Sequence, residues 1–95
     1  MNCEAIRALP RTGRENYFQV PKGPGVLLIF DKSGELWCAH PADSMLQEME
    51  DIIASNGHSL LAGFNEYAFQ TCITEADAYE LFSVIKEQCK PKGQH

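Results

Sequence analysis

The middle of this sequence lacks basic residues: no Lys or Arg occurs between Lys32 and Lys86. Nine acidic residues fall in that interval, while all eight basic residues lie at or beyond its ends, five up to Lys32 and three from Lys86 onward. A surface of negative potential repels a phosphate backbone and attracts a basic protein. The pattern therefore argues against a nucleic-acid partner and favours a basic protein partner, which would dock on an acidic surface that includes Glu48 and Asp51.

The basic residues near the start form a cluster of their own. Arg7, Arg11 and Arg14 lie close to Tyr17 and Phe18, a combination of cations and aromatic rings that can contact nucleic acid. Three arginines in a chain with a net charge of −5 give only weak support for nucleic-acid binding. We therefore expect no nucleic-acid partner.

The sequence also lacks long apolar runs and closely spaced cysteines. No run approaches the roughly 20 residues that span a bilayer, and the start has no signal-peptide pattern, so we expect a cytoplasmic protein with no membrane partner. The four cysteines, at positions 3, 38, 72 and 89, show no close spacing, which indicates reduced thiols and not a disulfide framework. A chain of 95 residues is expected to form a single domain, residues 1–95.

Catalytic and cofactor motifs are missing as well. The sequence has no Gly-x-Ser-x-Gly elbow, His-Glu-x-x-His helix, calcium-loop spacing or phosphate-binding loop. Cys38 and His40 form a local pair, because residues i and i+2 of a strand share a face with α-carbons about 6.5 Å apart. A metal bridging the two is one interpretation, and a small core thiol beside a strand-end imidazole is the favoured one. We therefore predict no catalytic residue, no metal and no cofactor, and a protein that is not an enzyme is favoured.

Residues 25–40, GVLLIFDKSGELWCAH, predict a central β-hairpin. The first strand is an unbroken apolar run, which is typical of a strand buried on both faces. Asp31 and Gly34 occupy the first and fourth positions of a type I turn, with Gly34 left-handed. This turn predicts a register with Phe30 opposite Leu36, Leu28 opposite Cys38 and Val26 opposite His40.

Two amphipathic helices are predicted around the rest of the chain, at about 42–55 and 75–89. The first has an apolar stripe at helical spacing, and Thr74 caps the second, whose buried stripe includes Tyr79. Residues 67–73 alternate as a strand, and residues 58–62 suggest a short one. We predict an α+β fold, an antiparallel sheet built round the hairpin with both helices packed on one face. Residues 1–24 are ambiguous: a helix over residues 2–9 is favoured over a strand paired with residues 17–20, and residues 91–95 form a frayed tail.

The predicted hairpin is apolar on both faces, and one layer of helices covers only one of them. The uncovered face favours self-association, so we predict a non-enzymatic interaction or accessory module that forms a homodimer and docks a protein partner. The predicted interface comprises Val26, Leu28, Phe30, Leu36, Met45 and Met49. One alternative is a small-molecule-binding domain or minor enzyme, with a pocket between sheet and helices lined by Trp37, Cys38, His40 and Tyr67. A second alternative is an acidic inhibitor of a basic protein surface.

Overall fold

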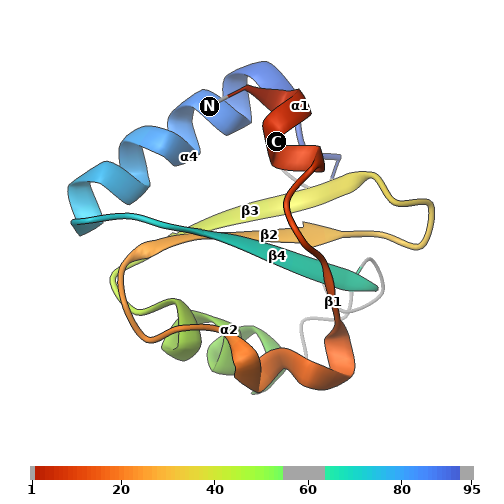
Figure 1. The fold of residues 1–95 in the computed structure, drawn as a ribbon, viewed down its shortest axis with the longest axis horizontal. Helices are drawn as coiled ribbons and strands as arrows, with labels where there is room; N and C mark the ends of the chain where they lie inside the picture. The colour runs from red at the N-terminus through yellow and green to blue at the C-terminus, as the bar shows by residue number, and fades with distance from the viewer. Residues whose placement is uncertain (1, 55–63, 93–95) are drawn as a thin grey trace.

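The computed structural model describes residues 2–54 and 64–92 of the chain. Within those residues the elements follow in the order α1 (Cys3–Arg7), β1 (Thr12–Gly13), the 3-10 helix η1 (Arg14–Gln19), β2 (Gly25–Phe30), β3 (Leu36–Ala42), α2 (Met45–Ala54), β4 (Glu66–Thr71) and α4 (Glu75–Cys89). The described strands form one antiparallel sheet in the order β1-β4-β2-β3 (Figure 1). The predicted α+β class and antiparallel sheet are therefore confirmed. None of the helices in the described residues is long and apolar enough to cross a membrane.

The turn between β2 and β3 forms as predicted. The Asp31 carboxylate accepts hydrogen bonds from the backbone amides of Ser33, at 2.9 Å, and Glu35, at 3.0 Å. The Ser33 hydroxyl donates to the same carboxylate at 2.6 Å, and this bond is the main cause that lowers the pKa of Asp31 below its usual value. Gly34 adopts a φ of +86°, a left-handed conformation that L side chains disfavour. The turn therefore depends on the residues that the sequence singled out.

The register of the hairpin differs from the prediction. Phe30 lies opposite Leu36 as expected, but the register then shifts, so that Trp37 has no partner in β2 and Ile29 lies opposite Cys38. A bulge of this kind moves every following residue of the strand by one position relative to its partner. The predicted pairs of Leu28 with Cys38 and Val26 with His40 are therefore wrong; the observed partners are Ala39 for Leu28, His40 for Leu27 and Pro41 for Val26.

Each face of β2 is covered by a different helix. Figure 1 shows α4 on one side of the sheet and α2 on the other, so the prediction that both helices pack on one face is wrong. All six residues of β2 are buried, because alternate side chains point into two separate core layers. The predicted interface is buried inside the fold: its members are at most 6% exposed, with Val26, Leu28, Phe30 and Leu36 in the layer under α4 and Met45 and Met49 in the layer under α2.

The N-terminal segment forms the short helix that the sequence favoured. Asn2 caps α1 by accepting a hydrogen bond from the Ala5 amide at 2.8 Å, and Ile6 is fully buried in the layer under α4. The strand considered for residues 17–20 is absent there, since residues 14–19 form η1. The Tyr67 hydroxyl donates a hydrogen bond to the Asn16 carbonyl at 2.7 Å, which ties η1 to β4.

A disulfide joins Cys3 in α1 to Cys89 at the end of α4, across 86 residues of sequence. The prediction of reduced thiols is therefore wrong for this pair, although Cys38 and Cys72 are free thiols. Sequence spacing could not reveal the bond, because two cysteines at opposite ends of a chain meet only through the tertiary fold.

The C-terminal strand and helix follow the prediction closely. Thr74 caps α4, its hydroxyl accepting a hydrogen bond from the Asp77 amide at 3.1 Å. Tyr79 is an exception: its side chain is 53% exposed and not part of the buried stripe. The predicted frayed tail is wrong for its first two residues, because Pro91 is buried and the Lys92 amide donates to the Leu36 carbonyl at 3.2 Å. The rest of that tail and the strand predicted for residues 58–62 lie outside the described residues.

Candidate functional site

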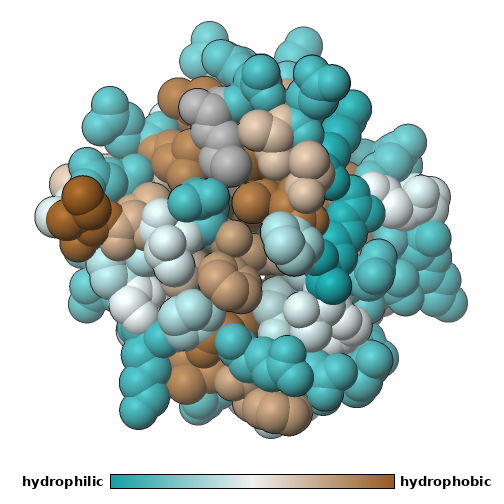
Figure 2. All heavy atoms as spheres, viewed as in Figure 1, coloured by the Kyte–Doolittle hydropathy of each residue, from teal (hydrophilic) through white to brown (hydrophobic). Residues whose placement is uncertain are grey.

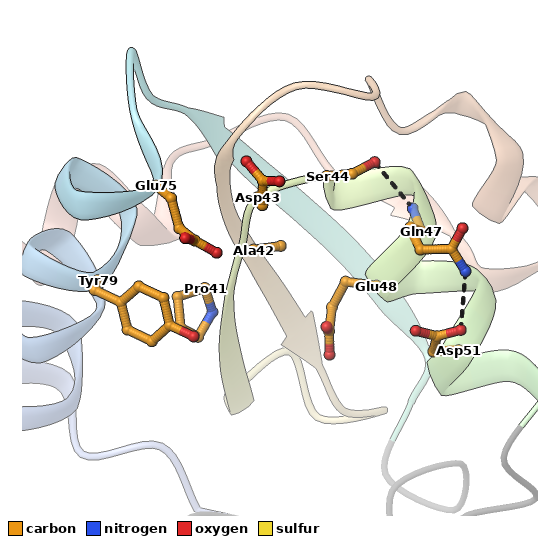
Figure 3. Close-up of a pocket in the computed structure, with 9 residues that line it drawn as sticks. All are labelled: Pro41, Ala42, Asp43, Ser44, Gln47, Glu48, Asp51, Glu75 and Tyr79. Atoms are coloured by element: carbon orange, nitrogen blue, oxygen red, sulfur yellow. Dashed lines mark hydrogen bonds between the residues drawn. The ribbon is translucent and has the colours of Figure 1, made fainter.

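A cavity of about 300 Å³ lies beside strand β3, between the start of α2 and the first turns of α4 (Figure 3). Its lining comprises Pro41, Ala42, Asp43, Ser44, Gln47, Glu48, Asp51, Glu75 and Tyr79. In Figure 3, Glu75 and Tyr79 extend from α4 toward Pro41, while Glu48 lies on the opposite side, on α2. Four of these lining side chains are carboxylates and none is cationic. The cavity therefore has a negative potential that repels phosphate groups.

A chain of polar contacts leads from this cavity into the sheet. The Glu48 carboxylate lies 3.6 Å from Nδ1 of His40, whose Nε2 lies 3.4 Å from Sγ of Cys38. Thiol, imidazole and carboxylate occur here in the order of a nucleophile, its base and an orienting acid. However, Cys38 is only 3% exposed, and burial raises the pKa of its thiol to about 12. The thiol stays protonated at neutral pH, so these contacts do not make a reactive nucleophile.

Hydrogen bonds within α2 fix a second carboxylate of the cavity. The Gln47 side-chain amide donates to the Asp51 carboxylate at 3.0 Å, as the dashed lines in Figure 3 show. The backbone amide of Gln47 donates to the Ser44 hydroxyl at 3.4 Å, which places Ser44 as the cap of the helix. Glu48 and Asp51, the two acids that the sequence predicted as a partner surface, therefore both line the cavity but already have partners within the chain.

The four residues predicted to bind a ligand do not line this cavity. The structure brings Cys38 and His40 together, while Tyr67 is fully buried and Trp37 is partly buried against the layer under α2. A ligand-binding role for these four residues stays a prediction. Sequence reasoning missed Asp43, Glu75 and Tyr79 as neighbours of the predicted acids, because their meeting depends on how α2 and α4 flank β3.

Basic residues from three distant segments gather at another part of the molecule, which we call the basic end. It comprises Arg7, Arg11, Lys32, Lys90 and Lys92, from α1 and the segment after it, from the β2–β3 turn and from the residues that follow α4. The same segments contain three acids, Glu4, Asp31 and Glu35, so they have a surplus of two positive charges. The rest of the chain has ten acids and three bases.

Direct contacts hold the basic end together. The Arg11 guanidinium donates hydrogen bonds to the carbonyls of Gly34, at 3.1 Å, and Arg7, at 3.2 Å. Its carbon Cζ lies 3.8 Å from the centre of the Phe30 ring, a cation–π geometry. These contacts join α1 to the β2–β3 turn.

Lys92 joins the chain that follows α4 to the same turn. Its ammonium group lies 3.8 Å from the Asp31 carboxylate and also pairs with Glu35. The hydrogen bond to Glu35 is the main cause that raises the pKa of Lys92. Lys92 therefore stays protonated throughout the neutral range.

No family model and no curated protein matches the chain, but solved structures do. The chain is similar to the N-terminal GIY-YIG endonuclease domain of UvrC from Thermotoga maritima, which was solved with its catalytic divalent cation, magnesium: 16% of residues are identical, the TM-score is 0.76, and 86% of this chain and 94% of that chain are covered. This chain has the fold of a GIY-YIG endonuclease domain. An asparagine-to-alanine point mutant of the same domain gives a TM-score of 0.77 with 93% of its chain covered. At this identity the likeness shows the fold alone.

This fold overturns the predicted non-enzymatic interaction module, because the solved domains that share it are endonucleases. The predicted absence of a nucleic-acid partner is overturned with it. The predicted homodimer, the basic protein partner and the alternatives of a small-molecule-binding domain or minor enzyme and of an acidic inhibitor stay predictions. The charge pattern of the sequence misleads because it places the bases at the two ends of the chain, whereas the fold brings most of them together on one end of the molecule.

The described residues of this chain do not gather into a site for a divalent cation. In residues 2–54 and 64–92, no three His, Cys, Asp or Glu side chains lie close enough together to hold a metal ion. Magnesium needs oxygen ligands arranged around a single point. The cavity carboxylates do not provide this arrangement, and Glu48 and Asp51 have other partners. No catalytic step through a metal follows from these residues.

Proposed function

We propose that this domain binds nucleic acid and that the phosphate backbone contacts the basic end. The observation that carries the proposal is the gathering of five cations at one end of an otherwise acidic molecule. Lys and Arg side chains that neutralise phosphates supply most of the sequence-independent affinity for nucleic acid. The fold supports the same class of ligand, since the solved domains that share it are endonucleases.

The charge distribution also gives the complex an orientation. The acidic cavity repels a polyanion while the basic end attracts it, so the molecule approaches with α1 and the β2–β3 turn foremost. Hydrophilic side chains occupy the upper right of the molecule in Figure 2, where Figure 1 places α1 and this turn. A cytoplasmic location belongs to the same proposal, because nucleic acid is available there.

Fluorescence anisotropy with a labelled DNA duplex of about 20 base pairs tests the proposal. The dissociation constant is measured over a range of salt concentrations. If all five cations contact phosphates, the slope of log K against log salt is about −4.5, from roughly −0.9 per contact. The double variant Arg7→Gln/Lys32→Gln removes two exposed cations and should reduce the slope by about 1.8. Arg11 is left in place because it packs on Phe30 and supports the fold.

Lys22→Gln is the matched control, since Lys22 is an exposed base outside the basic end. It removes one positive charge and should leave the affinity close to that of the wild type. An equal loss per removed charge in the control and in the basic-end variant would mean that net charge alone decides binding. That result, or no binding by the wild-type domain, would refute the proposed site.

A further inference from the structure

We propose that the Cys3–Cys89 disulfide is a redox-sensitive clamp that holds α1, and with it Arg7, in the basic end. Reduction of this bond releases α1 and weakens the binding of nucleic acid. The effect on binding rests on the proposed function, whereas the release of α1 does not. The two parts are therefore tested by separate measurements.

The helix α1 depends on outside contacts for its structure. It has five residues, far fewer than the roughly 12 to 15 that an isolated helix needs in water. Asn2 caps it, Ile6 is buried under α4, and the disulfide ties its first residue to α4. The disulfide is the covalent contact among these, so its loss leaves a short helix attached through a single fully buried side chain.

The position of the disulfide suits thiol–disulfide exchange. Cys3 and Cys89 are both half-buried, so the disulfide is partly open to a reductant in solution. Lys90 adjoins Cys89 in the chain, and Arg7 lies one helical turn from Cys3. Nearby cations stabilise thiolates and therefore favour the departure of a cysteine sulfur from a disulfide.

The exchange consumes a dithiol reductant. A thiolate of the dithiol attacks Sγ of one cysteine, the sulfur–sulfur bond breaks, and the other cysteine leaves as a thiolate that takes up a proton. The second thiol of the reductant then loses its proton and displaces the first cysteine, which also ends as a thiol. Two electrons pass to the protein, and the dithiol leaves as a cyclic disulfide.

Release of α1 affects two cations of the basic end, Arg7 and Arg11. Arg7 ends α1, and its carbonyl accepts a hydrogen bond from Arg11, so movement of α1 removes a cation and one of the contacts that position a second. Arg11 keeps its bond to Gly34 and its place over Phe30, which limits the effect to the helix itself. Loss of one phosphate contact in 0.1 M salt lowers the affinity roughly eightfold, from a slope of about −0.9 per contact.

The first measurement is hydrogen exchange of the oxidised domain and of the same domain reduced with dithiothreitol. Faster exchange of the Ile6 and Ala8 amides, with the amides of β2 still protected, is the expected result. Unchanged protection of α1 would overturn the clamp. Equal loss of protection in β2 would overturn it as well, since the bond would then hold the whole fold and not α1.

The second measurement is the affinity for the labelled duplex in both redox states. Reduction should weaken binding roughly eightfold in the wild type and in Cys72→Ser, the control for a thiol elsewhere, while Arg7→Gln should lose much less on reduction. An equal effect of reduction in Arg7→Gln would refute the role of Arg7. If the oxidised domain does not bind the duplex, the proposed function fails, and hydrogen exchange alone decides whether α1 is clamped.

Discussion

Removal of the Cys3–Cys89 disulfide should lower the free energy of unfolding by several kilocalories per mole. The bond closes a loop of 86 residues, and the loop-closure entropy for that length corresponds to about 4.6 kcal/mol at 25 °C. Measured effects of native disulfides fall at about 2–5 kcal/mol, because reduced chains keep some structure and native bonds hold some strain. A domain of this size has a total stability of about 5–15 kcal/mol, so the bond accounts for a large share of it.

Urea unfolding followed by circular dichroism measures this contribution. The double variant Cys3→Ser/Cys89→Ser should lose about 2–5 kcal/mol relative to the oxidised wild type, and the melting temperature should fall by roughly 4–8 °C for each kilocalorie. Cys72→Ser is the control, since it removes a free thiol and leaves the disulfide intact. A loss below about 1 kcal/mol in the double variant would refute the argument from chain entropy.

Three further predictions concern the backbone, the imidazole and the ligand. Gly25→Ala should cost about 1–3 kcal/mol in urea unfolding, because the new methyl group meets the Met45 side chain and the Gln70 carbonyl, while Gly23→Ala, with open space around it, should be near neutral. Burial lowers the pKa of the His40 imidazole below 6.5, although the nearby Glu48 carboxylate opposes the shift. As the pH falls, the imidazole therefore takes up a proton in the unfolded chain before it does so in the folded one. The free energy of unfolding should fall as the pH drops below about 6.5 and level off once the folded pKa is passed, and it should fall less in His40→Gln. Binding of the labelled duplex should persist in EDTA, because guanidinium and ammonium groups neutralise phosphates directly, and a loss of binding would point to a bridging cation.

Local structure could be predicted wherever short-range chemistry decides it. The turn at Asp31 and Gly34, the cap at Thr74 and the alternation of β4 were all visible in the sequence, because each depends on residues within a few positions of one another. The register of the hairpin was not, since the shift at Trp37 leaves no mark in the local sequence pattern. The candidate site was predicted only in part: two acids of the cavity were named from one helix face, while their neighbours come from other elements.

The sequence by itself determined the element types from the central hairpin to the last helix within the described residues, the apolar strand at the centre and the segregation of charge along the chain. Only the tertiary structure decided that α2 and α4 cover opposite faces of the sheet, which turned a predicted interface into two core layers. It also decided that Cys3 meets Cys89 and that cations from both ends of the chain lie together. Contacts between residues tens of positions apart depend on how whole elements pack, and no local pattern encodes that packing.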